Sequence, residues 1–102
     1  MAQQRTVGSH KTVVFTQGGV TRVVYQSTAV VEFSDLIITL NTGGWFTSTT
    51  KTRMNQASNQ FELGFRVYQK KGQWFVNAKY YDEPLPFVDG VVSFSSHKQK
   101  AL

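Results

Sequence analysis

Residues 41–64 constrain the fold of this chain more than any other segment, because they hold its clearest helical pattern and the glycines around it. A strand-like run ends at Gly43-Gly44, hydroxyl residues follow, and a helix is predicted over 49–63. Gly64 is predicted to close this helix in the left-handed conformation. The candidates for its N-cap are Thr47, Ser48 and Thr49. Its apolar stripe consists of Met54, Ala57 and Phe61.

Strand patterns lie on both sides of this helix and are rich in β-branched and aromatic residues. Glycine-containing turns at 17–19 and 70–72 indicate antiparallel hairpins. The order predicts one α+β domain over 11–95: an antiparallel sheet of about six to seven strands with the helix packed on it. A partly open barrel is the alternative, and 1–10 and 96–102 are expected to be flexible ends. The expected strand segments are 11–16, 20–26, 29–33, 36–40, 65–69, 73–79, 85–88 and 91–94.

The chain has 102 residues and no cysteine. This length suffices for one small domain with one core. The absence of cysteine excludes disulfides, thiolate zinc sites and cysteine nucleophiles. No apolar run has the length of a signal peptide core or of a membrane span. The sequence therefore predicts a soluble cytoplasmic protein without a membrane partner.

Positive charge is concentrated in one part of the sequence. The chain has 11 Lys and Arg against 6 Asp and Glu, a net charge of +5. Residues 51–79 contain six basic residues and one acid, Glu62, so six minus one gives this segment alone a charge of +5. Such a segment suits a polyanion or an acidic protein, although a plain solvated surface has the same composition. The six basic residues are Lys51, Arg53, Arg66, Lys70, Lys71 and Lys79.

Residue types with catalytic or metal-binding chemistry are few and scattered. His10 and His97 lie in the terminal segments without an acid at relay or ligand spacing. Asp82-Glu83 is an adjacent pair of acids, but a metal nuclease needs two or three acids converging on one cation. We therefore predict that the protein is not an enzyme and has no catalytic residue, metal or cofactor.

The double glycine Gly43-Gly44 has two interpretations. It does not match the spacing of a P-loop or of a dinucleotide-binding loop. The simpler interpretation is a turn or bulge after a strand. The other is that the glycines let the backbone approach a phosphate beside the amides of the helix N-terminus.

The aromatic residues of segment 73–81 divide between two faces if this segment is a strand. The better core face consists of Trp74, Val76, Ala78 and Tyr80. The opposite face mixes aromatic rings with an amide and a cation, which is the composition of a base-stacking platform. An edge or dimer contact explains this face equally well. It consists of Phe75, Asn77, Lys79 and Tyr81.

Two blocks of the sequence resemble a family of small proteins of tailed bacteriophages and prophages. They are Asn-Thr-Gly-Gly-Trp at 41–45 and Thr-Thr-Lys-x-Arg-Met-Asn-Gln at 49–56, and the similarity extends over about 23–92. The resemblance implies phage origin and expression in a bacterial cytoplasm, and it implies no activity. Phe46 stands where the resemblance leads us to expect a basic residue, so no phosphate contact is predicted there.

These patterns together favour a nucleic-acid-binding protein, with single-stranded DNA or RNA as the ligand. The predicted phosphate contacts are Lys51, Arg53, Arg66, Lys70, Lys71 and Lys79. The amides predicted to hydrogen-bond phosphates or base edges are Asn55, Gln56 and Asn59. The predicted stacking residues are Trp45, Phe75 and Tyr81.

Two other functions remain open at this stage. The same aromatic residues could anchor a host or phage protein, such as a polymerase or a defence component, with the cations as a steering rim. A chain of this size could also be a minor structural part of a virion. The sequence leaves open whether the protein forms homo-oligomers.

Overall fold

The computed structural model describes residues 11–96, and within them it has eight strands and one helix. This confirms the predicted α+β class. The ends predicted to be flexible fall outside the described residues, apart from Ser96. The elements are β1 (Thr12–Gln17), β2 (Val20–Tyr25), β3 (Thr28–Phe33), β4 (Ile37–Asn41), α1 (Ser48–Gln60), β5 (Phe65–Lys70), β6 (Gln73–Ala78), β7 (Leu85–Pro86) and β8 (Val91–Ser95).

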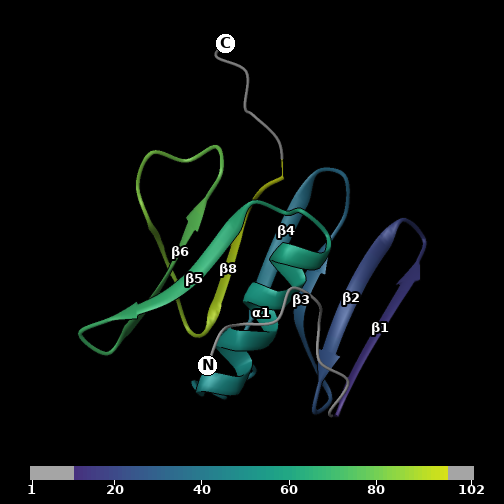
Figure 1. Cartoon of the computed structure of the whole chain (residues 1–102), viewed down its shortest axis with the longest axis horizontal. Helices are drawn as coiled ribbons and strands as arrows, with labels where there is room; N and C mark the ends of the chain where they lie inside the picture. The colour runs from purple at the N-terminus through teal and green to yellow at the C-terminus, as the bar shows by residue number, and fades with distance from the viewer. Residues whose placement is uncertain (1–10, 97–102) are drawn as a thin grey trace.

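The strands form two antiparallel sheets instead of the single sheet that was predicted, and neither closes into a barrel. Sheet A has the order β1-β2-β3-β4-β8, and sheet B has the order β5-β6-β7 (Figure 1). The chain leaves sheet A after β4, builds α1 and sheet B, and returns to sheet A with β8. This return places Phe94 opposite Ile38 and Val92 opposite Leu40.

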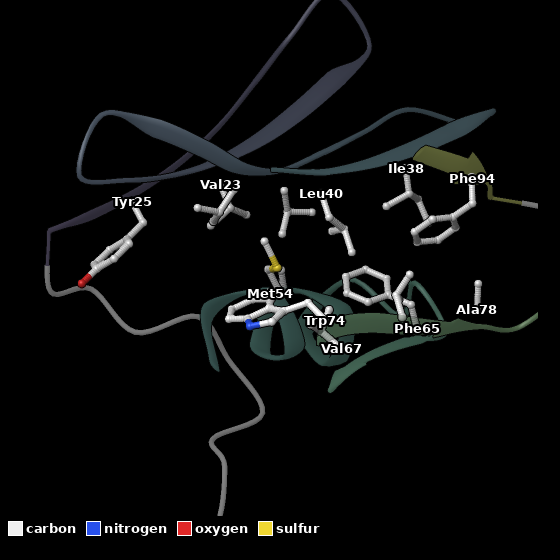
Figure 2. Close-up of a cluster of buried hydrophobic side chains, with 14 residues drawn as sticks. Val23, Tyr25, Ile38, Leu40, Met54, Phe65, Val67, Trp74, Ala78 and Phe94 are labelled. Atoms are coloured by element: carbon white, nitrogen blue, oxygen red, sulfur yellow. The ribbon is translucent and has the colours of Figure 1, made fainter. Parts of the chain in front are cut away.

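The hydrophobic core lies between two layers (Figure 2). Sheet A forms one layer, and α1 together with sheet B forms the other. Val23 and Leu40 of sheet A, Met54 of α1 and Val76 of sheet B are completely buried. Burial of each such side chain stabilises the fold by about 1.5–3 kcal/mol.

Helix α1 begins at a hydroxyl cap, as predicted. Thr47 is extended, and its Oγ1 accepts a hydrogen bond from the Thr50 amide at 3.2 Å. The helix ends three residues earlier than expected, because Glu62 takes the left-handed conformation (φ 54°) after its last turn; Gly64 is also left-handed (φ 73°), as predicted, but lies beyond the helix end. The Leu63 amide then donates to the Ser58 carbonyl at 2.9 Å, which is the long hydrogen bond of a Schellman motif.

The hairpin between β5 and β6 turns at Lys71 and Gly72, whose φ angles are 52° and 81°. Two positive φ angles are characteristic of a type I′ turn, and this turn matches the right-handed twist of the flanking strands. The short turn fixes the register of the hairpin. Lys70 therefore lies opposite Gln73, and Tyr68 lies opposite Phe75.

Candidate nucleic-acid interface

The outward side of the β5–β6 hairpin is a small surface of basic, amide and aromatic side chains. Alternation along both strands directs Phe65, Val67 and Trp74 into the core, where they are buried. The residues between them face outward and form three cross-strand pairs. We call this surface the β5–β6 face; its pairs are Arg66 with Asn77, Tyr68 with Phe75, and Lys70 with Gln73.

Two aromatic rings lie at the centre of the β5–β6 face. The centroids of Tyr68 and Phe75 are 5.8 Å apart, and the ring planes differ by 24°, so the rings are stacked. Both side chains are half-buried. Pro86 of β7 lies opposite Phe75 on the other side of β6. The result is an apolar strip across sheet B that is open to solvent on one side.

Cations surround this strip. Arg66 and Lys70 belong to the β5–β6 face, Lys71 lies in the adjoining turn, and all three are exposed. Within residues 11–96 the structure has one ion pair, which joins Arg22 Nε to Glu32 Oε1 at 2.7 Å on sheet A. The three hairpin cations therefore have no carboxylate partner in this part of the chain, and their field reaches solvent.

Three other predicted contact residues lie outside the three cross-strand pairs of the β5–β6 face. The Lys51 ammonium lies 5.5 Å from the ring centroid of Trp74, a residue on the inward side of β6. Lys79 follows the end of β6, and its ammonium lies 5.4 Å from the ring of Tyr80. Asn59 is exposed near the end of α1.

Arg53 connects α1 to sheet A. Its Nε donates to Thr12 Oγ1 at 3.0 Å, and its Nη1 donates to Gln56 Oε1 at 3.1 Å. The guanidinium also lies 5.7 Å from the ring centroid of Tyr25. The predicted grouping of Arg53 with the hairpin cations is therefore wrong, because its guanidinium contacts sheet A whereas those cations belong to the β5–β6 hairpin of sheet B.

Asn55 and Gln56 are buried, with 7% and 4% of their surfaces exposed, which corrects their prediction as ligand-binding amides. The Asn55 side chain donates to the Val67 carbonyl at 3.0 Å and accepts from the Val67 amide at 2.7 Å. Ser58 makes the same pair of hydrogen bonds with the Phe65 carbonyl and amide, at 2.7 and 3.0 Å. These side chains therefore bind α1 to the free edge of β5.

Tyr81 is also a structural residue instead of a stacking residue. Strand β6 ends at Ala78, and the Tyr81 amide donates to the Ala78 carbonyl at 3.1 Å, so the alternation breaks before Tyr81. Its ring packs edge-on against Phe94 at 6.2 Å. Its hydroxyl accepts a hydrogen bond from the Ser95 amide at 2.9 Å.

The replacement Tyr81→Phe tests this assignment. It removes the hydroxyl that accepts from Ser95 and keeps the ring, so we expect a loss of about 1 kcal/mol in the free energy of unfolding. Urea denaturation measures this loss. A variant as stable as the wild type would show that the Tyr81 hydroxyl contributes nothing measurable to the fold.

The loop before α1 forms a turn in which the amides of Gly43, Gly44 and Trp45 are bonded within the loop, and this supports the simpler interpretation of the double glycine as a turn. The Gly43 amide donates to Asn41 Oδ1 at 2.8 Å, and the Gly44 amide donates to Thr42 Oγ1 at 3.2 Å. The Trp45 amide donates to the Thr42 carbonyl at 2.9 Å. The Trp45 side chain is 53% exposed on this loop.

The sequence analysis missed the contributions of Tyr68 and Gln73 to the β5–β6 face. The signal that identifies them is the two-residue turn at Lys71-Gly72, because its length places Tyr68 opposite Phe75. Alternation within β6 finds Gln73, which lies two residues before Phe75, but it cannot find Tyr68, since it says nothing about the neighbouring strand.

The described residues contain no group of three His, Cys, Asp or Glu side chains that could hold a metal ion. His10 and His97 lie outside these residues. No helix in the part of the chain that is described has the length and apolar character needed to cross a membrane.

The similarity of the chain to known proteins lies at the level of a family. No curated protein and no solved structure matches it. A family model described as "Kyanoviridae Gp96 protein" matches residues 1–94, which is nearly the whole chain. The phage affiliation expected from the sequence resemblance is thereby confirmed, and the chain belongs to the Kyanoviridae Gp96 protein family of bacteriophage proteins.

Proposed function

We propose that this phage protein binds single-stranded nucleic acid on the β5–β6 face. The observation that carries the proposal is the half-buried stack of Tyr68 and Phe75, which is open to solvent on one side and has exposed cations without a carboxylate partner beside it. Base-aromatic stacking stabilises a complex by about 1–3 kcal/mol per base and works with any base. A duplex hides the faces of its bases, so this surface favours single strands.

The remaining side chains of the β5–β6 face have complementary roles in the proposal. Arg66, Lys70 and Lys71 bind phosphates along the strand, and the amides of Gln73 and Asn77 hydrogen-bond sugar, phosphate or base edges. Basic residues near an aromatic platform are the usual composition of a sequence-tolerant single-strand site. Arg53, Asn55, Gln56 and Tyr81 have structural roles instead and take no part.

The double variant Lys70→Ala/Lys71→Ala tests the phosphate contacts. Each contact with single-stranded DNA contributes about 0.7 to the slope of log affinity against log salt concentration, so two contacts contribute about 1.4. We expect weaker binding at low salt and a slope shallower by about that amount. Fluorescence anisotropy of a labelled oligothymidine at several salt concentrations measures both quantities.

The matched control compares two single variants that each remove one positive charge. Lys70→Gln removes it from the end of β5 in sheet B, and Lys11→Gln removes it just before β1 in sheet A. Lys70→Gln should flatten the slope more than Lys11→Gln does. Equal effects would assign the binding to net charge alone. A wild-type protein that forms no complex at low salt and about 50 µM protein, well within the range of non-specific binding, would end the proposal.

A protein partner is the second candidate function, and exposed aromatic side chains before α1 favour it. Trp45 and Phe46 are 53% and 55% exposed, and the Phe46 ring lies edge-on to Trp74 at 5.5 Å. Large exposed aromatic residues are frequent anchors of protein interfaces. Affinity purification from infected cells with nuclease present separates the two candidates: a protein retained by the wild type and lost with Trp45→Ala supports this one.

A further inference from the structure

The free edges of the two sheets are protected unequally. An unpaired edge strand is a template for another strand, and proteins usually block such edges. The edge of β5 is blocked by α1, because Asn55 and Ser58 occupy the amides and carbonyls of Val67 and Phe65. Side chains of the helix thus take the place of a neighbouring strand.

The edges at β7 and β8 are also limited. Strand β7 has two residues, Leu85–Pro86, and proline has no amide to donate. Strand β8 is engaged at both ends. Val91 exchanges hydrogen bonds with Val88 at 2.9 and 3.0 Å, and the Ser95 amide donates to the Tyr81 hydroxyl.

Strand β1 has a contact from α1 at its first residue, where Arg53 donates to Thr12, and none of these protections is found at residues 13–17. It lies at the margin of sheet A, and no described strand pairs with it on the side away from β2 (Figure 1). Its six residues contain no proline and no charge, and its register with β2 has no bulge. Val13, Val14 and Phe15 are 59%, 39% and 41% exposed, so apolar side chains project from both faces of the strand.

The hairpin geometry identifies the backbone groups that face outward from β1. In an antiparallel pair, residues alternate between those bonded to the partner strand and those directed away from it. The Gln26 amide donates to the Lys11 carbonyl at 3.1 Å, so position 11 faces β2 and sets the alternation. The amide and carbonyl of Val14, three residues later, therefore point away from β2.

We propose that a second copy of this chain pairs with β1 in antiparallel orientation about a two-fold axis at Val14. In this register Val14 faces Val14 of the second copy, and Val13 faces Phe15 of the second copy. Aromatic and β-branched side chains directly opposite each other are favourable pairs. Lys11 faces Gln17 of the second copy, so no like charges meet although the chain carries a net charge of +5.

The pattern of edges favours a second copy over a chain of many copies. An antiparallel pair of identical strands is isologous, so each copy uses its β1 edge once and the interface closes. The other edges are blocked or limited, and assembly therefore stops at two. The dimer joins two copies of sheet A into one continuous sheet across the axis.

The variant Val14→Pro tests the pairing. It removes an amide that is directed away from β2, so the β1–β2 hairpin keeps its own ladder while the dimer loses two symmetric hydrogen bonds. Sedimentation velocity over a range of protein concentrations should show a wild-type dimer and a dissociation constant raised about thirtyfold or more in Val14→Pro. Val14→Thr keeps both the amide and the side-chain branching and should dimerise like the wild type. A wild type that stays monomeric up to about 1 mM, where even weak association gives dimer, would overturn the proposal.

Cysteine cross-linking tests the register without relying on the proline variant, because the native chain has no cysteine. The two Cα atoms of position 14 lie about 5.5 Å apart across the axis, within disulfide range. Those of position 13 are diagonal neighbours about 8 Å apart, beyond this range. Val14→Cys should therefore cross-link under mild oxidation far more than Val13→Cys. Random collision predicts the reverse order, because Val13 is the more exposed, and that result would disprove the register.

Discussion

Replacing Asn55 with alanine is expected to lower the free energy of unfolding by about 3 kcal/mol, although the residue belongs to a polar helix. Its side chain satisfies both the amide and the carbonyl of Val67, which is 2% exposed. Leaving a buried backbone group without a partner costs about 1–3 kcal/mol, and the variant leaves two. The better helix propensity of alanine offsets about 0.5 kcal/mol of this.

Asn59→Ala is the matched control, because it makes the same change one turn later at an exposed position. Its effect on stability should stay within about 0.5 kcal/mol. Urea denaturation followed by circular dichroism gives both values. Similar small losses in the two variants would mean that the contact between α1 and the edge of β5 contributes little to stability.

The burial of Asn55 also explains where helix prediction from the sequence failed. The apolar stripe correctly identified Met54 and Ala57 as core residues, and both are fully buried. Asn55, Gln56 and Asn59 were predicted to reach a ligand, which requires an accessible polar face such as that of a helix lying on the face of a sheet. Here α1 lies beside a strand edge, where the backbone groups of β5 need polar partners, so polar side chains of the helix are buried.

The strands were predictable because their residues and turns carry local signals. Alternation in β6 correctly placed Trp74, Val76 and Ala78 inward, since it depends only on the strand itself; the same prediction was wrong for Tyr80, which lies beyond the end of β6 and is 43% exposed. The division into two sheets was not predictable, because the pairing of β8 with β4 joins residues about 50 positions apart. The residue pattern within a strand does not indicate which distant strand it will pair with.

The candidate site was predictable only in its hairpin part. Lys70, Lys71 and Phe75 are held together by a tight turn, so their closeness in sequence also places them close in space. Arg53 is equally close to the basic segment in sequence, yet its guanidinium contacts Thr12 and Tyr25 on sheet A. In this chain the charges counted along 51–79 lie together only where the hairpin carries them.

Gly43→Ala is expected to lower the free energy of unfolding by about 3 kcal/mol. Gly43 has a φ of +63°, where an alanine costs about 1–2 kcal/mol. A Cβ at this position would also lie 2.5 Å from Thr28 Oγ1 and 2.7 Å from Thr28 Cγ2 at the start of β3. Relieving such an overlap by moving neighbouring groups typically costs a further 1–3 kcal/mol.

Gly44→Ala separates the two contributions. Gly44 also has a positive φ, +86°, but a Cβ there would meet no atom within 4 Å, so this variant should lose only about 1 kcal/mol. Thr28→Ala removes the two closest atoms, and the double variant Thr28→Ala/Gly43→Ala should therefore be more stable than the sum of the single effects predicts. Thermal or urea unfolding of the wild type, Thr28→Ala, Gly43→Ala and the double variant measures this coupling. If Gly43→Ala and Gly44→Ala lose the same stability, the loop before α1 is held by its turn conformation and its internal hydrogen bonds, and its close packing against β3 contributes nothing measurable.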